Sequence, residues 1–564
     1  MKDKPYYEVR KIKDIRDLVN SSCELFAERN AYLYKKDGKY TPILFKQVKK
    51  NMDELGTALI ELGLKDKRIA VIGENRYEWA ISYLAVINGV GVVVPLDKQL
   101  PENEILNCLH RSEAKCIIYS SKLKEKIDSI KNQTDASILI DMDIEEDENG
   151  VYSLKKLLER GRELLDQGNK EYLNSEIDNH KMAELLFTSG TTSESKAVML
   201  SHRNICFNIE NQCKMLEIVP EDIFLSVLPI HHAYECTCGF LTPLYRGACV
   251  AYCEGLRHIA ENMKEAHASV ILSVPVMFEM IYGKLWEAIR KQGKEKLVKR
   301  MIKVTNFLDK LHIHIKRKVF KQIHEQLGGN VKVLIAGAAA INPEVAQGFR
   351  DLGILAVQGY GLSECAPIAA LNRDVDYKDD AAGLPLVNTE IKIVDPNDEG
   401  VGEIATKGEH VMLGYYKNEE ATKEAIQDGW LHTGDLGYID SDGFVHITGR
   451  KKNVIITKNG KNVYPEEIEK LLSDSPFIKE SLVYGKRNGD NITITAQILL
   501  DKDYIEQTYG KSITEEKIKK LVWEDVKRIN QKLVIYKHIK AIEIREKEFE
   551  KTTTLKIKRY KENV

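Results

Sequence analysis

The segment RIAVIGENRYEWAISYLAVINGVGVVVPL, residues 68–96, is the best guide to the fold class of this chain. It begins with a short β-branched run, continues through a longer apolar stretch and ends in a second β-branched run. The part from 80 to 96 contains Ser, Tyr, Asn and two Gly, so a buried helix leading into a strand is favoured over a membrane span. Continuous apolar strands separated by a helix are typical of a parallel sheet covered on both faces.

The same alternation of strand-like and helix-like stretches extends along most of the 564 residues. Further short β-branched runs stand at 115–120, 137–142, 249–253 and 331–337. We therefore predict an α/β fold whose large N-terminal domain is built from parallel-sheet α/β layers.

The pattern changes near residue 383, where apolar and polar residues begin to alternate around Gly and Asp turns. The segments EIKIVDPNDEGVGEIATKG (390–408) and GYIDSDGFVHIT (437–448) predict a small antiparallel β subdomain. A mixture of strands and helices after residue 453 predicts a small, mobile α+β C-terminal domain. The predicted domains are 1–451 and 452–564.

Charge and cysteine content narrow the class of protein. The chain has 83 Lys and Arg against 85 Asp and Glu, which argues against the strongly basic balance of a nucleic-acid-binding protein. Ten cysteines are scattered along the chain, and the N-terminal sequence MKDKPYYEVRKIKDIRDL lacks the apolar segment of a secretory signal. We therefore expect a cytoplasmic protein that has no nucleic acid among its partners.

The segment LLFTSGTTSESKAVMLSH, residues 185–202, places a hydroxyl-rich loop between two apolar stretches. Hydroxyl groups, free backbone N–H groups and the single Lys196 suit the binding of phosphate oxygens. The loop nearly matches a Walker phosphate loop through Gly190 and Lys196, but Ala197 replaces the Ser or Thr that would bind Mg²⁺. A P-loop NTPase is therefore disfavoured, while an ordinary surface turn stays open for this segment alone.

The segment QGYGLSECAP (358–367) follows an apolar strand and combines an aromatic ring, two Gly and an acid in one turn. Tyr360 can stack on a base, and Glu364 can hold a divalent cation through its oxygen atoms.

Two later segments add charges that suit a nucleotide. Asp435 stands in the Gly-flanked turn of GWLHTGDLGYID, where an ionised carboxylate can accept hydrogen bonds from the two hydroxyls of a ribose. Arg450 follows a Gly in GRKKNVIITKNGKNVYPEEIE. Each residue alone has an ordinary structural explanation, but four such segments on one chain favour a nucleotide-binding enzyme.

Together the four segments resemble the motifs of the adenylate-forming superfamily, which includes acyl-CoA synthetases, peptide-synthetase adenylation domains and beetle luciferases. The superfamily's loop has a Thr-Ser-Gly-Thr-Thr-Gly-x-Pro-Lys-Gly core, from which Ser193, Ser195 and Ala197 depart. The turn that ends at Glu364 has Ser where Thr is more usual, and Thr433-Gly434-Asp435 and Gly449-Arg450 match fully. Within the superfamily, three segments are most similar to those of long-chain fatty acid CoA ligases: TTSESKAVMLSH, LPIHHAYE and a basic insertion.

The resemblance implies a two-step reaction. A fatty carboxylate attacks the α-phosphorus of ATP in the presence of Mg²⁺, giving an acyl-adenylate and pyrophosphate, and the thiol of coenzyme A then takes the acyl group and releases AMP. The implied ligands are ATP, Mg²⁺, coenzyme A and a medium- or long-chain fatty acid. The alternative is an acyl-AMP ligase that transfers the acyl group to the phosphopantetheine of an acyl carrier protein.

Two other functions are less favoured. An amino-acid-adenylating enzyme would need an acidic anchor for the ammonium group, and Glu235 is the only acid in HHAYECTCGF. A non-catalytic nucleotide-binding protein would lack the catalytic charges, yet Lys556, Glu364 and Asp435 are all present.

The resemblance also implies roles for individual residues. Catalysis is assigned to Lys556, Glu364 and Lys196, and the Mg²⁺ ligands are Thr188 and Glu364. Asp435 holds the ribose, with Arg450 nearby. The remaining nucleotide-binding positions are the loop residues Thr188, Ser189, Gly190, Thr191, Thr192 and Lys196, the small residues Gly337, Ala338 and Ala339, and the turn residues Gln358, Tyr360, Gly361 and Ser363.

The C-terminal segment FEKTTTLKIKRY (549–560) resembles the closing motif of the family, whose lysine corresponds to Lys556. Glu550 and Leu555 depart from the usual Pro and Gly, and a lysine-rich tail without this resemblance would be expected to fray in solvent. The family rotates its small domain between the two steps, which assigns the hinge to Lys452 and coenzyme A binding to Gly460.

Two further segments carry alternatives. HHAYECTC (231–238) combines His and Cys, but the spacing of Cys236 and Cys238 disfavours zinc, and the resemblance places His232 in the acyl pocket.

Residues 284–321 contain thirteen Lys and Arg against three Asp and Glu, with apolar residues at helical spacing. This pattern indicates either a solvated helix pair or peripheral contact with an anionic membrane.

Overall fold

The computed structural model describes residues 4–188, 195–457, 461–488, 491–510, 512–552 and 556–562. The chain divides into two compact units, which are described separately below. Unit 1 comprises 1–190, 195–390 and 407–429. Unit 2 comprises 191–194, 391–406 and 430–564.

The first sheet of unit 1 contains the strand–helix–strand arrangement predicted for residues 68–96. Strands β3 (Lys67–Ile72) and β4 (Gly91–Leu96) are parallel, with Ile69 opposite Val93, and helix α3 (Tyr77–Ala85) connects them. All four residues from Ile69 to Ile72 are fully buried, so both faces of the sheet are covered. In spatial order the strands are β19 (Gly414–Tyr415), β9 (Lys196–Ser201), β8 (Met182–Thr188), β4, β3, β5 (Cys116–Tyr119), β6 (Ile138–Asp141) and β7 (Val151–Ser153).

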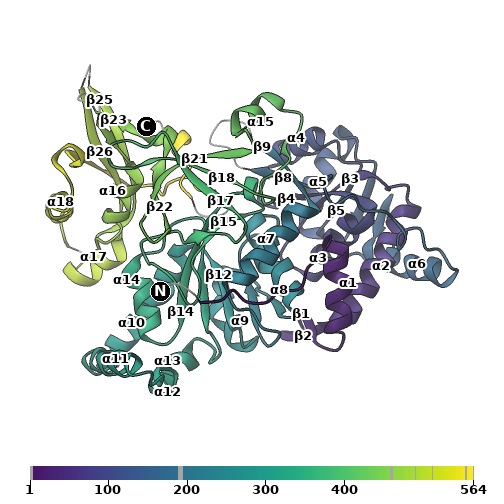
Figure 1. Ribbon diagram of the computed structural model, residues 1–564, viewed down its shortest axis with the longest axis horizontal. Helices are drawn as coiled ribbons and strands as arrows, with labels where there is room; N and C mark the ends of the chain where they lie inside the picture. The colour runs from purple at the N-terminus through teal and green to yellow at the C-terminus, as the bar shows by residue number, and fades with distance from the viewer. Residues whose placement is uncertain are drawn as a thin grey trace. The chain divides into compact units, whose positions relative to one another are not determined.

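The second sheet of unit 1 is also mainly parallel, and Figure 1 shows its strand β12 in teal, its strand β15 in green and its strands β1 and β2 in purple. Its apolar strand residues pack with helix residues such as Phe349 into one core. In spatial order its strands are β16 (Leu384–Pro385), β15 (Ile368–Leu371), β14 (Leu355–Gly361), β13 (Val333–Ala336), β12 (Val270–Ser273), β10 (Ile223–Ser226), β11 (Cys249–Tyr252), β1 (Asn30–Lys36) and β2 (Lys39–Leu44).

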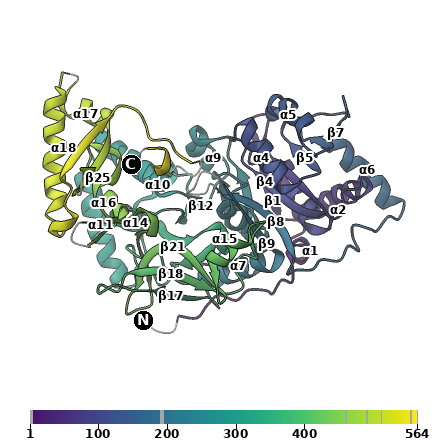
Figure 2. The same ribbon diagram turned by 90° about the horizontal axis from the view of Figure 1, so that it is seen from above.

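The helices of unit 1 cover these sheets, as the two views in Figures 1 and 2 show. On the first sheet, for example, Ile105 and Leu109 of α4 pack on Val94 and Ile117. The helices are α1 (Ile15–Leu25), α2 (Phe45–Glu61), α3, α4 (Glu102–Ser112), α5 (Lys124–Ile130), α6 (Leu154–Asp166), α7 (His202–Met215), α8 (Thr242–Arg246), α9 (Ile259–Glu265), α10 (Pro275–Lys291), α11 (Glu295–Lys310), α12 (Lys316–Val319), α13 (Lys321–Gln326), α14 (Pro343–Asp351) and α15 (Glu419–Ala425).

Unit 2 begins with the antiparallel strands predicted from the alternating sequence. Strands β17 (Glu390–Val394), β18 (Gly402–Lys407), β21 (Trp430–Ile439) and β22 (Val445–Arg450) belong to one antiparallel sheet. The turn between β21 and β22 is closed by Asp440, whose carboxylate accepts hydrogen bonds from the backbone of Asp442 and Phe444. This turn lies in the segment 437–448, from which antiparallel strands were predicted.

The rest of unit 2 is an α+β layer. A three-stranded sheet of β25 (Ile478–Asn488), β26 (Asn491–Leu500) and β27 (Ala541–Arg545) packs on helices through residues such as Ile468, Val483 and Val526. The other elements are the short strands β23 (Ile455–Ile456) and β24 (Asn462–Val463) and the helices α16 (Pro465–Leu472), α17 (Lys502–Tyr509) and α18 (Glu515–Asn530). The predicted fold class is therefore confirmed.

Two further facts concern the whole chain. All ten cysteines are free thiols, and nine of them are buried. Among the residues that the structure describes, no helix has both the length and the apolar character needed to cross a lipid bilayer.

Candidate functional site

One edge of the second sheet in unit 1 gathers several of the predicted site residues. Strands β12, β13 and β14 are parallel, with Ser273 opposite Ala336 and Ala336 opposite Gln358. Their carboxyl ends therefore lie at the same edge, which is where parallel α/β sheets bind ligands. Strand β13 leads there into the segment 337–339, and β14 carries Tyr360 near its end and leads into the turn with Glu364, so residues predicted to bind the nucleotide meet at this edge.

The small residues after β13 leave room for a neighbouring aromatic ring. A Cβ atom on Gly337 would lie 2.7 Å from the ring of Tyr234, so only glycine allows this close approach. Tyr234 is buried, and its hydroxyl donates a hydrogen bond of 3.1 Å to the carbonyl of Ile335. Ala338 adopts a positive φ of 70°, and Ala339 is exposed.

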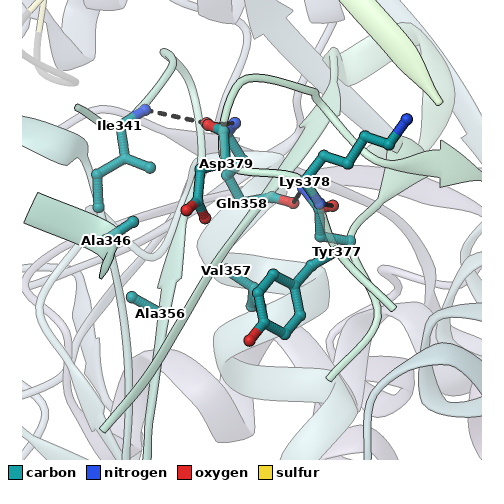
Figure 3. A pocket seen from close by; sticks show the side chains of 9 residues that line it. Ile341, Ala346, Ala356, Val357, Gln358, Tyr377, Lys378 and Asp379 are labelled. Atoms are coloured by element: carbon teal, nitrogen blue, oxygen red, sulfur yellow. Dashed lines mark hydrogen bonds between the residues drawn. The ribbon is translucent and has the colours of Figure 1, made fainter. Parts of the chain in front are cut away.

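Gln358 occupies the same edge, but its side chain is fully engaged within the protein. The buried amide accepts a hydrogen bond from the backbone of Ile341 at 3.0 Å and donates to the carbonyl oxygens of Asp379 and Ala381. Figure 3 shows the bond to Ile341 and the small pocket beside it, which Val357 and Tyr377 also line. The side chain of Gln358 therefore joins two loops behind the edge.

The turn after β14 presents Glu364. Tyr360 is buried in β14, and a Cβ atom on Gly361 would lie 1.9 Å from the carbonyl oxygen of Pro367, so the chain can turn there only with glycine. Ser363 begins a short 3₁₀ turn, which leaves the Glu364 side chain half-exposed.

Tyr415 connects Glu364 to Lys196, and sequence reasoning missed it. Its hydroxyl donates a hydrogen bond of 2.9 Å to Glu364 Oε1, and the Lys196 ammonium lies 4.5 Å from the centre of its ring. Burial, followed by the nearby Glu364 carboxylate, raises the pKa of Tyr415 far above its usual range, so the hydroxyl keeps its proton. Strand β19 places Tyr415 opposite Val198 of β9, near Lys196. These three side chains form one group, which we call the Lys196–Tyr415–Glu364 group.

The predicted phosphate loop stands in the sequence between β8 and β9. Thr188 and Lys196 form the last pair of these two strands, and the Thr188 hydroxyl donates a hydrogen bond of 3.3 Å to the carbonyl of Lys196. Arg111, which the sequence did not single out, donates to the hydroxyl of Ser195 at 3.1 Å and adds a second cation there. The other predicted loop residues, Ser189, Gly190, Thr191 and Thr192, lie outside the described residues.

His232 follows β10 and lies half-exposed, with its Nδ1 accepting a hydrogen bond of 3.3 Å from the backbone of Tyr234. Nearby, burial raises the pKa of Glu235 to about 8, and this carboxyl accepts a hydrogen bond of 2.6 Å from Ser226. Glu235 is therefore neutral at pH 7 and unsuited to anchor an ammonium group.

In unit 2, Asp435 and Arg450 form an ion pair at the end of the β21–β22 hairpin. They are directly opposite each other in the register, and Arg450 Nε lies 2.7 Å from Asp435 Oδ1. Asp435 is buried, whereas Arg450 is half-exposed. The preceding turn is fixed by Glu403, which accepts hydrogen bonds from the backbone of Gly434 and from Lys451. The hairpin thus presents a carboxylate of fixed orientation.

Lys556 belongs to the same set of charges and lies in a short hairpin. The backbone N–H of Thr552 donates to the carbonyl of Lys556 at 2.8 Å, and the backbone N–H of Lys556 donates to the Thr552 hydroxyl at 3.2 Å. The backbone N–H of Lys558 donates to the carbonyl of Glu550. Arg559 anchors this segment to Glu469 of α16 and to the carbonyl of Val483.

The surroundings of Lys556 favour its neutral form more than water does. The residue as a whole is exposed, but partial removal of the amine from water and the positive charge of Arg450 lower its pKa to about 8, while Asp435 acts in the opposite direction. Removal from water and the charge of Arg450 also lower the pKa of Lys452 to about 8. Gly460 lies outside the described residues, between strands β23 and β24.

Comparison with known proteins fits this arrangement. Residues 19–416 match the family described as AMP-binding enzyme, and residues 452–562 match the AMP-binding enzyme C-terminal domain. A chloroplastic long-chain-fatty-acid–[acyl-carrier-protein] ligase of Arabidopsis thaliana is 27% identical over 92% of this chain and 80% of its own. Long-chain-fatty-acid–CoA ligase 5 of Rattus norvegicus is 30% identical over 79% of this chain and 69% of its own.

A solved structure shares the fold. The anthranilate CoA ligase AuaEII in complex with anthranoyl-AMP superposes with a TM-score of 0.77 at 18% identity, covering 100% of this chain and 97% of that one.

Proposed function

Because the chain belongs to the AMP-binding enzyme family, we propose that it activates a medium- or long-chain fatty acid with ATP and transfers the acyl group to coenzyme A. The reaction releases pyrophosphate in its first step and AMP in its second. Relatives named as fatty acid ligases over most of their length support the fatty acid substrate. The observation that supports the activating step is the Lys196–Tyr415–Glu364 group. In this group Tyr415 contacts both Lys196, the cation assigned to the phosphates, and Glu364, the carboxylate assigned to Mg²⁺.

The first step brings two anions together, because the fatty carboxylate attacks the α-phosphorus of a negatively charged nucleotide. Preorganised positive charge is the main way in which proteins lower such a barrier. We assign this charge to Lys196, at the end of the phosphate loop, and to Lys556, which bridges the carboxylate and the phosphate.

The residues present fit a Mg²⁺ ion. Mg²⁺ is usually held by one or two protein carboxylates together with phosphate oxygens. Glu364 Oε1 is already bonded to Tyr415, which leaves the second oxygen for the metal, and the Thr188 hydroxyl stands at the end of β8. When bound, Mg²⁺ would neutralise phosphate charge.

The nucleotide itself is assigned to Tyr360 and the 337–339 stretch, which contact the adenine, and to Asp435, which accepts hydrogen bonds from the ribose. Arg450 orients the Asp435 carboxylate through their 2.7 Å contact. His232 is assigned to the acyl pocket.

For the second step, we assign the hinge to Lys452 and the approach of coenzyme A to Gly460. The relative that acts on an acyl carrier protein supports the alternative acceptor, the phosphopantetheine of such a carrier. The free cysteines support a reducing compartment, the cytoplasm.

A panel of carboxylic acids of graded chain length tests this proposal. We expect exchange of labelled pyrophosphate into ATP to depend on added fatty acid and to peak in the medium- to long-chain range. Adding either coenzyme A or an acyl carrier protein, and measuring AMP release, then identifies the acceptor. Absence of exchange with every acid would refute the activity, and AMP release with the carrier protein alone would establish the alternative.

The Lys196–Tyr415–Glu364 group makes a prediction about metal dependence. In the Tyr415→Phe variant the ring still faces Lys196, but Glu364 loses its hydrogen bond. Hydrogen bonds to charged groups contribute roughly 1.5–3 kcal/mol, so we expect about a tenfold higher Mg²⁺ concentration for half-maximal pyrophosphate exchange. Titration of Mg²⁺ at saturating fatty acid measures this shift.

The neighbouring tyrosine provides a matched control. Tyr416 donates its hydroxyl to Glu113 at 2.9 Å, so the Tyr416→Phe variant should keep the Mg²⁺ dependence of the unmodified enzyme. The positioning role of Tyr415 would be rejected if the two variants required the same Mg²⁺ concentration.

A further inference from the structure

Helix α11 has an exposed apolar stripe that the activation reaction does not use. The exposed fractions are 58% for Leu297, 50% for Val304, 63% for Phe307 and 55% for Leu311. Spacings of seven, three and four residues place the four side chains on one face of the helix, with Leu311 at its C-cap. The opposite face, which includes Val298 and Ile302, packs on the core formed with α10 and α13. Figure 1 shows α11 at the lower margin of unit 1.

A row of cations follows one long side of this stripe. Helical spacing places Lys296, Lys303 and Lys310 there and Arg300 at the adjoining margin of the stripe, and each of the four is exposed. Within the described part of the chain, none of the four forms an ion pair, whereas Lys299 in the same helix pairs with Glu295 at 2.7 Å. The stripe and this row of cations together are called the α11 surface below.

We propose that the α11 surface binds the anionic phospholipid of a bilayer from the aqueous side. A helix that lies in the interface places its apolar side chains at the headgroup boundary and its Lys and Arg among the phosphates. Protein–protein interfaces, in contrast, are depleted in lysine and enriched in Tyr and Trp. The stripe contains neither of these aromatic residues, and three of its four flanking cations are lysines. The charge of the surface is complementary to an anionic membrane.

Flotation of the full chain with phospholipid vesicles, in the absence of substrate, tests this inference independently of catalysis. We expect binding to vesicles of phosphatidylcholine that contain about one third phosphatidylglycerol, weak binding to pure phosphatidylcholine, and loss of binding as salt screens the charges. Each cation near an anionic surface strengthens binding about fivefold, so a Lys296→Glu, Arg300→Glu, Lys303→Glu variant should bind at least about 100-fold more weakly. A Val304→Ser, Phe307→Ser variant should weaken binding while leaving the charge unchanged.

Helix α18 provides the matched control. The Lys517→Glu, Lys519→Glu, Lys520→Glu variant makes the same change in net charge at exposed lysines of unit 2 and should bind anionic vesicles like the unmodified chain. Equal loss of binding in the two charge variants would overturn the proposal. It would also be overturned if the α11 variants bound vesicles normally but lost either self-association or binding to an acidic acyl carrier protein. Thermal unfolding of each variant confirms that the fold is retained.

Discussion

Replacing Lys556 by alanine is expected to slow formation of the acyl-adenylate by about 100- to 1000-fold, the usual cost of losing one preorganised charge from a transition state. The segment around Lys556 is held by two hydrogen bonds between Thr552 and the Lys556 backbone and by the contact of Arg559 with Glu469, and none of these contacts involves the Lys556 side chain. The alanine variant should therefore fold normally. Pyrophosphate exchange with fatty acid measures the loss.

The second half-reaction separates a catalytic role of Lys556 from general damage to the protein. If Lys556 acts only in adenylation, the alanine variant should convert a supplied acyl-adenylate and coenzyme A to product at about the rate of the unmodified enzyme, within roughly a factor of three. An equal fall in both half-reactions would argue against the assigned role.

The lowered pKa of Lys556 adds a dependence on pH. Because that pKa is about 8, the side chain loses its positive charge as the pH rises through 8, earlier than an ordinary lysine does. The kcat/KM for adenylation should therefore fall above pH 8. The Lys556→Arg variant keeps its charge and should lose this alkaline fall. The Lys452→Arg variant is the control, because Lys452 also has a pKa of about 8 but is not assigned to the reacting groups.

The strands of unit 1 could be predicted because their burial leaves a local signal. Where both faces of a strand are covered, as in Ile69–Ile72 of β3 and in β5, every residue is apolar, and the β-branched residues stand out from the helices on either side. The turn that carries Glu364 could also be located, because Gly361 is required where the chain approaches Pro367. The hairpin that ends in Asp435 and Arg450 was visible from its alternating residues.

Contacts between distant segments left no such signal. Tyr415 stands 51 residues from Glu364, and only the pairing of β19 with β9 brings it to Lys196. The grouping of 391–406 with 430–564 depends on the register of β18 and β21, where Gly402 lies opposite Gly437. The closing hairpin depends on the ion pair between Arg559 and Glu469, two charges whose partnership cannot be read from their spacing.

Replacing Asp435 by asparagine is expected to lower kcat/KM for ATP by about 100-fold while leaving the KM for fatty acid unchanged. The substitution keeps the shape of the side chain but removes the charge that we assign to the ribose hydroxyls, and charge-assisted bonds contribute roughly 1.5–3 kcal/mol each. Binding of AMP, measured by calorimetry, should weaken by a similar factor.

Loss of the ion pair must be distinguished from loss of the ribose contact. Asp435 is buried and Arg450 is half-exposed, so the Asp435→Asn variant should also unfold at a slightly lower temperature. The Asp440→Asn variant is the matched control, because Asp440 closes the same hairpin and lies 2.9 Å from His446 at its far end. If Asp440→Asn lowers the melting temperature as much but binds AMP normally, the effect of Asp435 is on the nucleotide. If Asp435→Asn itself binds AMP with unchanged affinity, the ribose is held elsewhere, because a carboxylate that orients it cannot lose its charge without cost.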